Sequence, residues 1–404
     1  MTQLNQSQTS QSVPGTWAKT FTYYAAFIAL GLTTSSLGPT LPGLAHSTSS
    51  DIGKISFLFV LRSLGYLLGS FNAGHLYDKR PGNPVIAFSL AIIAALLIFV
   101  PVIPVLWILA AVLMLVGFAE GTVDVGGNTL LVWLHRDKVG PFMNGLHFTF
   151  GIGALLSPII VAQAIGLTGG IQWAYWTLAI LIFPIAVWVL RIPSPQSQVN
   201  DVTETIKPAQ PVLILLILTF YFLYVGGEVG FGGWIYTYTI STGLGTETSA
   251  AYLNSIFWGA LTAGRLLSIP IATRMRPGAV LLVNLLGCLA SLGLVLLFPG
   301  SAAILWIGTI GTGLFMASIF PTMLNLAQSK MTITGKITSW FFVGASAGGM
   351  ALPWIVGQLF EPVGPKTVIL AIFATLALAM LLFVAISFYN NGRRPSPTPL
   401  QPSR

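Results

Sequence analysis

Charged side chains are scarce in this sequence. They make up 7% of the 404 residues, against about 25% in an ordinary soluble domain. Hydrophobic residues reach 54%, and no segment outside the long apolar runs could build a separate globular core. The composition therefore excludes a soluble protein and favours one that spans a membrane.

Several kinds of reactive chemistry are also missing. Cys288 is the only cysteine, so the chain can form no intrachain disulfide. No metal-ligand cluster, phosphate loop or nucleophile triad is present, because His135 and His147 lie in different predicted elements and the glycine-rich stretches lie inside apolar runs with no strand before them. We therefore expect no enzyme activity, no bound metal and no cofactor.

The apolar residues gather in twelve runs. Each is close to the roughly 20 residues that a helix needs to cross a hydrocarbon core about 30 Å thick, and none alternates as a β-barrel strand does. The sequence thus predicts an all-α membrane protein with twelve transmembrane helices, at approximately 18–41, 52–75, 84–102, 104–134, 141–164, 171–190, 211–241, 249–272, 279–298, 302–327, 336–359 and 367–390.

The basic residues indicate how these helices are oriented. Fourteen of the eighteen lie before the first run, in every second gap, or after the last run, whereas only Lys54 and Lys366 lie in the other gaps. By the positive-inside rule both termini are cytoplasmic. The net charge of +8 reflects this topology and forms no basic block, so we expect no nucleic-acid partner. We expect a multi-pass protein of the bacterial inner or eukaryotic plasma membrane, functional as a monomer, whose partners are the lipid bilayer and a small molecule.

Polar segments and a repeat divide the chain in two. We expect disordered tails at 1–17 and 391–404 and a central cytoplasmic linker at 191–210, which separate six-helix bundles at 18–190 and 211–390. The sequence Arg-Pro-Gly at 80–82 recurs 196 residues later, and PIIVAQ at 158–163 recurs as PWIVGQ 195 residues later. Two matches at nearly the same offset indicate two pseudo-symmetric halves in parallel orientation, which place a substrate site at the midplane between them.

Local motifs resemble those of a known family. The loop GHLYDKRPG at 74–82 is similar to the Gly-x-Leu-x-Asp-Arg-x-Gly loop of the major facilitator superfamily, although Lys79 stands where arginine is usual. The stretch GTVDVGGN at 121–128 resembles fucose permeases, and YVGGE at 224–228 and LHF at 146–148 resemble sodium-dependent glucose transporter relatives. The resemblance implies the major facilitator fold, transport of a monosaccharide coupled to protons or sodium, and a gating role for Asp78 and Arg80.

Run 104–134 carries the most informative polar stripe. Glu120, Asp124 and Asn128 are spaced i, i+4, i+8 and share one helix face. A charged side chain at mid-bilayer costs about 2.5 to 3.5 kcal/mol on insertion scales, so each is a functional candidate. Asp124 and Asn128 offer the acceptors and donors that sugar hydroxyls need, and Asp124, with Glu120, is a candidate for cation coupling. Arg62 lies at a matching depth of about 23 Å from the cytoplasmic side, and we expect it to pair with Glu120.

Run 211–241 holds the second group of candidates. Five glycines surround Glu228, so this helix is easily unwound or bent, as helices at transporter binding sites often are. We predict that Glu228 binds the substrate and that Trp234 stacks against a sugar ring. The alternative for the aromatic residues here is a belt at the outer interface, which we favour for Tyr236 and Tyr238.

Weaker candidates complete the set. His147 could bind sugar or shuttle protons, or it could join two helices by a hydrogen bond. Asn325 is a candidate wall residue of the substrate site. Arg265 lies nine residues from Arg274, so we expect a cation near the cytoplasmic side that serves in gating. Trp258 could line the cavity or face lipid.

Two functions are compatible with these residues. The first is a monosaccharide symporter, for a hexose or deoxyhexose, that works by alternating access with protons or sodium. The alternative is a proton-coupled exporter of amphipathic small molecules. The polar content of the cavity distinguishes them, because a hexose requires many hydrogen-bonding groups and one stacking ring, whereas an exporter requires a mostly apolar wall.

Overall fold

The computed structural model describes residues 15–196, 210–331 and 335–389. All the secondary structure in these ranges is helical, so the prediction of an all-α protein is confirmed. The predicted terminal tails and central linker fall largely on residues 1–14, 197–209 and 390–404, outside the described residues.

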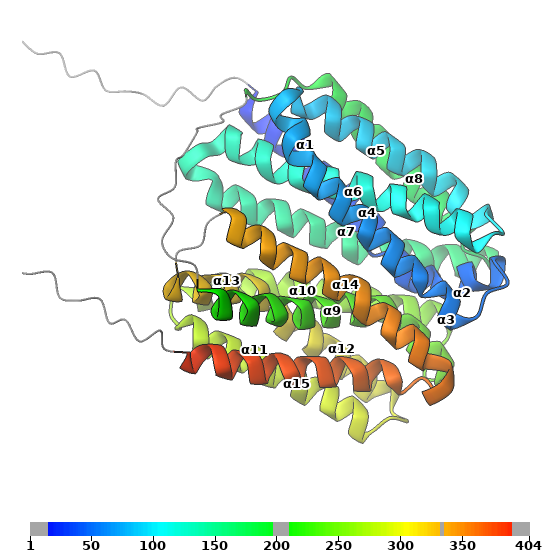
Figure 1. Cartoon of the computed structure of the whole chain (residues 1–404). Coiled ribbons are helices and arrows are strands. Elements are labelled where there is room, and N and C mark those ends of the chain that lie inside the picture. The colour runs from blue at the N-terminus through cyan, green and yellow to red at the C-terminus, as the bar shows by residue number, and fades with distance from the viewer. Residues whose placement is uncertain (1–14, 197–209, 332–334, 390–404) are drawn as a thin grey trace, which may run out of the picture.

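Two groups of helices pack side by side (Figure 1). The first group contains α1 (Thr16–Thr34), α2 (Leu37–Ser47), α3 (Ile52–Ile55), α4 (Phe57–Lys79), α5 (Gly82–Phe99), α6 (Leu106–His135), α7 (Val139–Thr168) and α8 (Gln172–Arg191), with 3-10 turns at Val100–Val102 and Arg136–Lys138. The second contains α9 (Pro211–Ser241), α10 (Glu247–Ala272), α11 (Pro277–Leu297), α12 (Ala302–Met316), α13 (Ile319–Lys330), α14 (Gly335–Val363) and α15 (Thr367–Phe388).

Within the described residues, ten segments are long and apolar enough to cross a membrane, judged by length and composition. The two remaining runs of the predicted twelve correspond to α1 followed by α2 and to α10. Both lie among the other helices, since α1 packs on α7 and α10 packs on α7 and α12.

Three of the predicted helices are each broken in two, and the run at 52–75 breaks at Ser56 between α3 and α4. The run at 18–41 breaks between α1 and α2, and the run at 302–327 breaks between α12 and α13. Pro39 and Pro321 each lie four residues after a break, where a proline ring clashes with the carbonyl of residue i−4 and has no N–H to donate. Pro158 frees the carbonyl of Ala154 within α7 in the same way, and the Ser35 hydroxyl donates to it at 2.9 Å.

Small residues allow close approach within each bundle. Gly65 and Gly69 of α4 lie directly against the backbone of α6, and Gly348 of α14 lies against the backbone of α9 at Phe222. In a membrane, helix association depends on such packing because lipid is as apolar as the side chains themselves.

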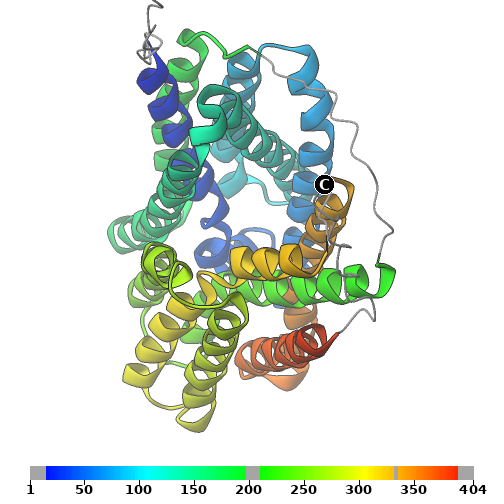
Figure 2. The ribbon, with the colours of Figure 1, turned by 90° about the vertical axis from the view of Figure 1, so that its left-hand side faces the viewer.

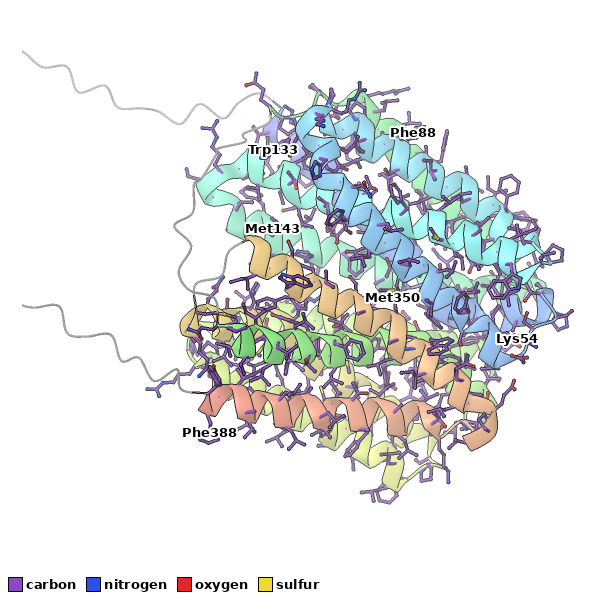
Figure 3. All side chains as sticks on the ribbon, in the orientation of Figure 1. Lys54, Phe88, Trp133, Met143, Met350 and Phe388 are labelled. Carbon is purple, nitrogen blue, oxygen red and sulfur yellow. The ribbon has the colours of Figure 1, made fainter. Side chains whose placement is uncertain are left out.

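The two bundles meet most firmly at one end. The pairs α7 with α10, α4 with α14, and α2 with α9 cross the boundary. Figure 2 looks along the bundles from the opposite end, where α1 begins and α15 ends. Figure 3 places Lys54 at the firmly joined end and Phe388 at the opposite end.

Hydrogen bonds join the two bundles toward the Lys54 end. Glu361 of α14 accepts from the backbone N–H of Ile52 at 3.1 Å, and Gln358 donates to the carbonyl of Gly53 at 2.7 Å. Farther in, Ser255 of α10 donates to the carbonyl of Leu155 at 2.6 Å. This end is therefore closed in the present conformation.

Candidate functional site

An ion pair joins Arg62 of α4 to Glu120 of α6. The Nε atom of Arg62 donates to Oε2 of Glu120 at 2.9 Å, and Nη2 donates to Oε1 at 2.5 Å. The side chains are 12% and 3% exposed. The predicted pairing of these two residues is thus present in the structure.

The same guanidinium also binds the broken end of α1. Its Nη1 and Nη2 atoms donate to the carbonyls of Thr34 at 3.0 Å and Thr33 at 3.1 Å, and the hydroxyl of Thr34 donates to Glu120 at 3.2 Å. The last carbonyls of a helix have no partner within it, so a planar group with several donors satisfies them well. Arg62 therefore ties the helix break of the first transmembrane segment to α6.

Asp124 lies one turn beyond Glu120 and has different partners. The phenol of Tyr66 donates to its Oδ2 atom, and the amide of Asn128 donates to Oδ1 at 3.0 Å and to the Asp124 carbonyl at 2.9 Å. The structure thus brings Asp124 and Asn128 together. We did not single out Tyr66 from the sequence, although its spacing of four residues from Arg62 matches the spacing of Asp124 from Glu120.

Asp124 differs from the other membrane-embedded acids in its charge balance. Within the described spans, Glu120 is paired with Arg62 and Glu228 lies near Arg265. Asp124 has no cationic partner there and accepts only neutral hydrogen bonds. Its side chain is partly exposed. A carboxylate in this setting can take up a proton or bind a small cation without breaking an ion pair.

Glu228 lies on α9 beside the break between α12 and α13. The phenol of Tyr224 is 2.5 Å from Oε2 of Glu228 and 2.8 Å from the carbonyl of Met316, the last residue of α12. The Nη2 atom of Arg265 is 3.9 Å from Oε1 of Glu228, and the two side chains are 32% and 15% exposed. Glu228 and Arg265 therefore form a loose, partly hydrated pair.

The glycines around Glu228 do not interrupt the helix, contrary to our expectation. α9 runs without a break from Pro211 to Ser241. Gly232 instead lies against the ring of Trp258, and Gly233 lies against the ring of Phe59. The absence of a side chain here provides room for neighbouring aromatic rings, while helix breaks occur elsewhere, including those before Pro39 and Pro321.

Trp234 lies at the closed end of the molecule. It is 0% exposed, its indole N–H donates to the carbonyl of Pro353 at 2.9 Å, and the rings of Phe59 and Phe360 pack against it. In this conformation Trp234 contacts aromatic side chains and a backbone carbonyl. A stacking role toward a sugar stays a prediction.

His147 faces the second bundle from α7. Its side chain is exposed, and its ring meets Phe27 edge-on with centroids 5.9 Å apart. One turn farther along α7, Gly151 packs against Thr262 of α10. Because α7 and α10 run in opposite directions, His147 and Arg265 lie on the same side of this contact, toward the Phe388 end.

The remaining candidates lie apart from these groups. Asn325 is exposed on α13, and Asp78 and Arg80 are exposed at the end of α4. Among the described residues no ion pair joins either of the latter two to another side chain. In the same part of the chain, no group of three or more histidine, cysteine, aspartate or glutamate side chains could hold a metal ion.

The sequence matches the family described as the Major Facilitator Superfamily over residues 23–353. It is similar to human sodium-dependent glucose transporter 1, with 32% identity over 373 residues that cover 83% of this chain and 72% of that protein. The Xenopus laevis protein of the same name is 36% identical over 354 residues, covering 80% of this chain and 72% of its own length.

Solved structures show the same architecture. A D-xylose-proton symporter superposes with a TM-score of 0.73 at 12% identity, covering 91% of this chain and 97% of that one. The nucleoside transporter NupG gives a TM-score of 0.70 at 13% identity, covering 94% of this chain and 100% of that one. The predicted fold of two six-helix bundles is confirmed, and the chain belongs to the major facilitator superfamily of membrane transporters.

Proposed function

We propose that this protein carries a monosaccharide, a hexose or deoxyhexose, across a cell membrane by alternating access, and that a proton or sodium ion moves with it. The observation that carries the proposal is Asp124, the membrane-embedded carboxylate without a cationic partner among the described spans. The names of the relatives, glucose transporters that depend on sodium, support the same substrate class.

Coupling follows from the charge of Asp124. An ionised carboxylate is costly in a closed, poorly hydrated protein interior, by about 2.5 to 3.5 kcal/mol on insertion scales. Binding a cation removes most of this cost, so the protein changes conformation most readily when the cation is bound. Glu120 does not compete for this cation because Arg62 already neutralises it.

Substrate binding is assigned to the polar groups on both sides of the bundle boundary. Asn128 and His147 in the first bundle and Glu228 in the second provide donors and acceptors for hydroxyl groups. All three side chains are partly or fully exposed. This polar content favours a sugar over the amphipathic substrates of the alternative exporter.

The conformation is inward-facing if both termini are cytoplasmic, as the positive-inside rule indicates. The closed end, with Glu361 on Ile52 and Gln358 on Gly53, then faces the outside. Opening toward the outside would separate α4 from α14 and α2 from α9 at this end while the opposite end closes.

Uptake into proteoliposomes tests the proposal. The purified protein should accumulate a radiolabelled hexose when a sodium or a proton gradient is imposed, and an ionophore that collapses that gradient should abolish accumulation. Efflux of amphipathic dyes without any hexose uptake under either gradient would refute the sugar assignment and favour the exporter.

A further inference from the structure

The guanidinium of Arg265 retains most of its hydrogen-bonding capacity. Among the described residues its side chain makes no hydrogen bond, and its contact with Glu228 at 3.9 Å is too long for one. Glu228 already has the phenol of Tyr224 on its other oxygen. The pair of Glu228 and Arg265 is therefore balanced in charge, while the N–H donors of Arg265, of which an arginine has five, stay free.

A second free donor lies on the same helix face. Trp258 precedes Arg265 by seven residues, two turns of α10, and is 8% exposed. Its indole N–H is buried and has no hydrogen-bond partner. The ring packs against Gly232, one turn beyond Glu228 on α9. A buried donor without a partner is costly, which points to a group that accepts from it in another state of the site.

We propose that Glu228, Arg265 and Trp258 form a subsite for two neighbouring hydroxyl groups of an uncharged sugar, and that Glu228 keeps the subsite selective against sugar acids by neutralising Arg265. This inference rests on the proposed function. A hydroxyl oxygen that accepts from Arg265 and donates to Glu228 bridges the gap between them, and a second one accepts from the indole N–H.

The charge balance gives the subsite its selectivity. A hexuronate would be attracted to Arg265, but its carboxylate would lie beside that of Glu228, and like charges in contact disfavour binding strongly. An uncharged hexose meets no such repulsion. Replacing Glu228 with glutamine keeps a hydrogen-bonding side chain of the same shape and leaves Arg265 as an unopposed cation.

Competition in proteoliposomes tests this inference. Uptake of a labelled hexose is measured with increasing concentrations of the unlabelled hexose or of the corresponding hexuronate, with both sodium and proton gradients present. In the wild type the hexuronate should inhibit at least about tenfold more weakly than the hexose. In Glu228→Gln the ratio of the two inhibition constants should shift toward the hexuronate by about 10- to 100-fold. The double variant Glu228→Gln with Arg265→Gln should lose that shift.

Matched variants exclude trivial explanations. Glu247→Gln, at an exposed acid that begins α10, should leave the ratio unchanged. Trp258→Phe keeps a ring and removes the N–H, so the inhibition constant of the hexose should rise several-fold with the ratio unchanged. If Glu228→Gln transports too slowly, stabilisation of the detergent-purified variant against heat by hexuronate replaces uptake as the readout.

The outcomes separate the two proposals. No hexose accumulation by the wild type would overturn the proposed function itself. Accumulation by the wild type with an unchanged ratio in Glu228→Gln would overturn the subsite alone. A shift that persists in the double variant would also overturn it, because Arg265 would then not be the group that attracts the acid.

Discussion

Removal of the Glu120 carboxylate is expected to destabilise the folded protein strongly. Glu120→Ala leaves the guanidinium of Arg62, which is 12% exposed, without its counterion. Breaking one side of a buried ion pair costs about 3 to 5 kcal/mol. At roughly 2 °C per kcal/mol for a large domain, the melting temperature should fall by about 6 to 10 °C.

The double variant Arg62→Met with Glu120→Met isolates the interaction. It removes both charges but leaves the carbonyls of Thr33 and Thr34 without the donors that Arg62 provides. The Thr33 carbonyl still accepts from the Ser36 hydroxyl at 2.8 Å, so only the Thr34 carbonyl is left bare. At about 1 kcal/mol or more for a bare carbonyl, the loss should be about 1 to 2 kcal/mol, smaller than either single change. The two single changes should therefore be strongly non-additive.

The single cysteine provides the assay. Cys288 is fully buried in α11, so a thiol-reactive dye labels it only when the protein unfolds. Melting curves followed by this labelling, with exposed Glu247→Ala as a control, measure each variant in the same background. Additive losses in the double variant, or a loss below about 1 kcal/mol in Glu120→Ala, would refute the view that the pair and the helix break form one unit.

Three further predictions concern other parts of the molecule. Tyr66→Phe removes one of the hydrogen bonds to the charged Asp124, worth about 1.5 kcal/mol or more. The less stabilised carboxylate should bind its cation more tightly, so the cation concentration for half-maximal uptake should fall about tenfold. A rise in that concentration would contradict the assigned contact. Gly348→Leu places a side chain against the backbone of α9 and should lower stability by about 2 kcal/mol or more in melting curves, whereas an unchanged melting temperature would show that α14 does not pack there. The hydrogen bond from the Lys54 side chain lowers the pKa of Asp51, so the ionised Asp51 stabilises the fold at neutral pH and this stabilisation is lost as pH falls below about 4. The melting temperatures of the wild type and Asp51→Asn should therefore converge below that pH. A difference that stays constant with pH would contradict the stabilising role of this pair.

Much of the architecture could be predicted from the sequence because a bilayer imposes a simple length and polarity rule. The apolar runs led to the helices and the repeat led to two bundles. The pairing of Arg62 with Glu120 followed from matching their depths, since a buried charge needs a counterion nearby.

The breaks in the helices were predicted in the wrong place. Glycine near Glu228 suggested an interrupted helix, but glycine can also accommodate a neighbouring ring, and sequence alone does not separate the two uses. Pro39 and Pro321 each follow a break by four residues. Proline alone does not place a break either, because Pro158, Pro184 and Pro270 lie inside unbroken helices.

Contacts between helices were the least predictable feature. The roles of Tyr66 and Trp258 depend on which face of a neighbouring helix they meet, and a spacing such as that of Tyr66 from Arg62 does not fix this. The burial of Trp234 between Phe59 and Phe360 likewise depends on how the two bundles close at one end.

The most direct test of the central claim is the transport behaviour of Asp124→Asn. This variant keeps a side chain of the same size that can still bond to Tyr66, but it cannot bind a proton or exchange its charge for a cation. In proteoliposomes it should lose gradient-driven accumulation of hexose and retain exchange of labelled for unlabelled hexose at equal concentrations, with Glu247→Gln indistinguishable from wild type in both. Accumulation by Asp124→Asn at the wild-type level would contradict the assignment of this carboxylate as the coupling site.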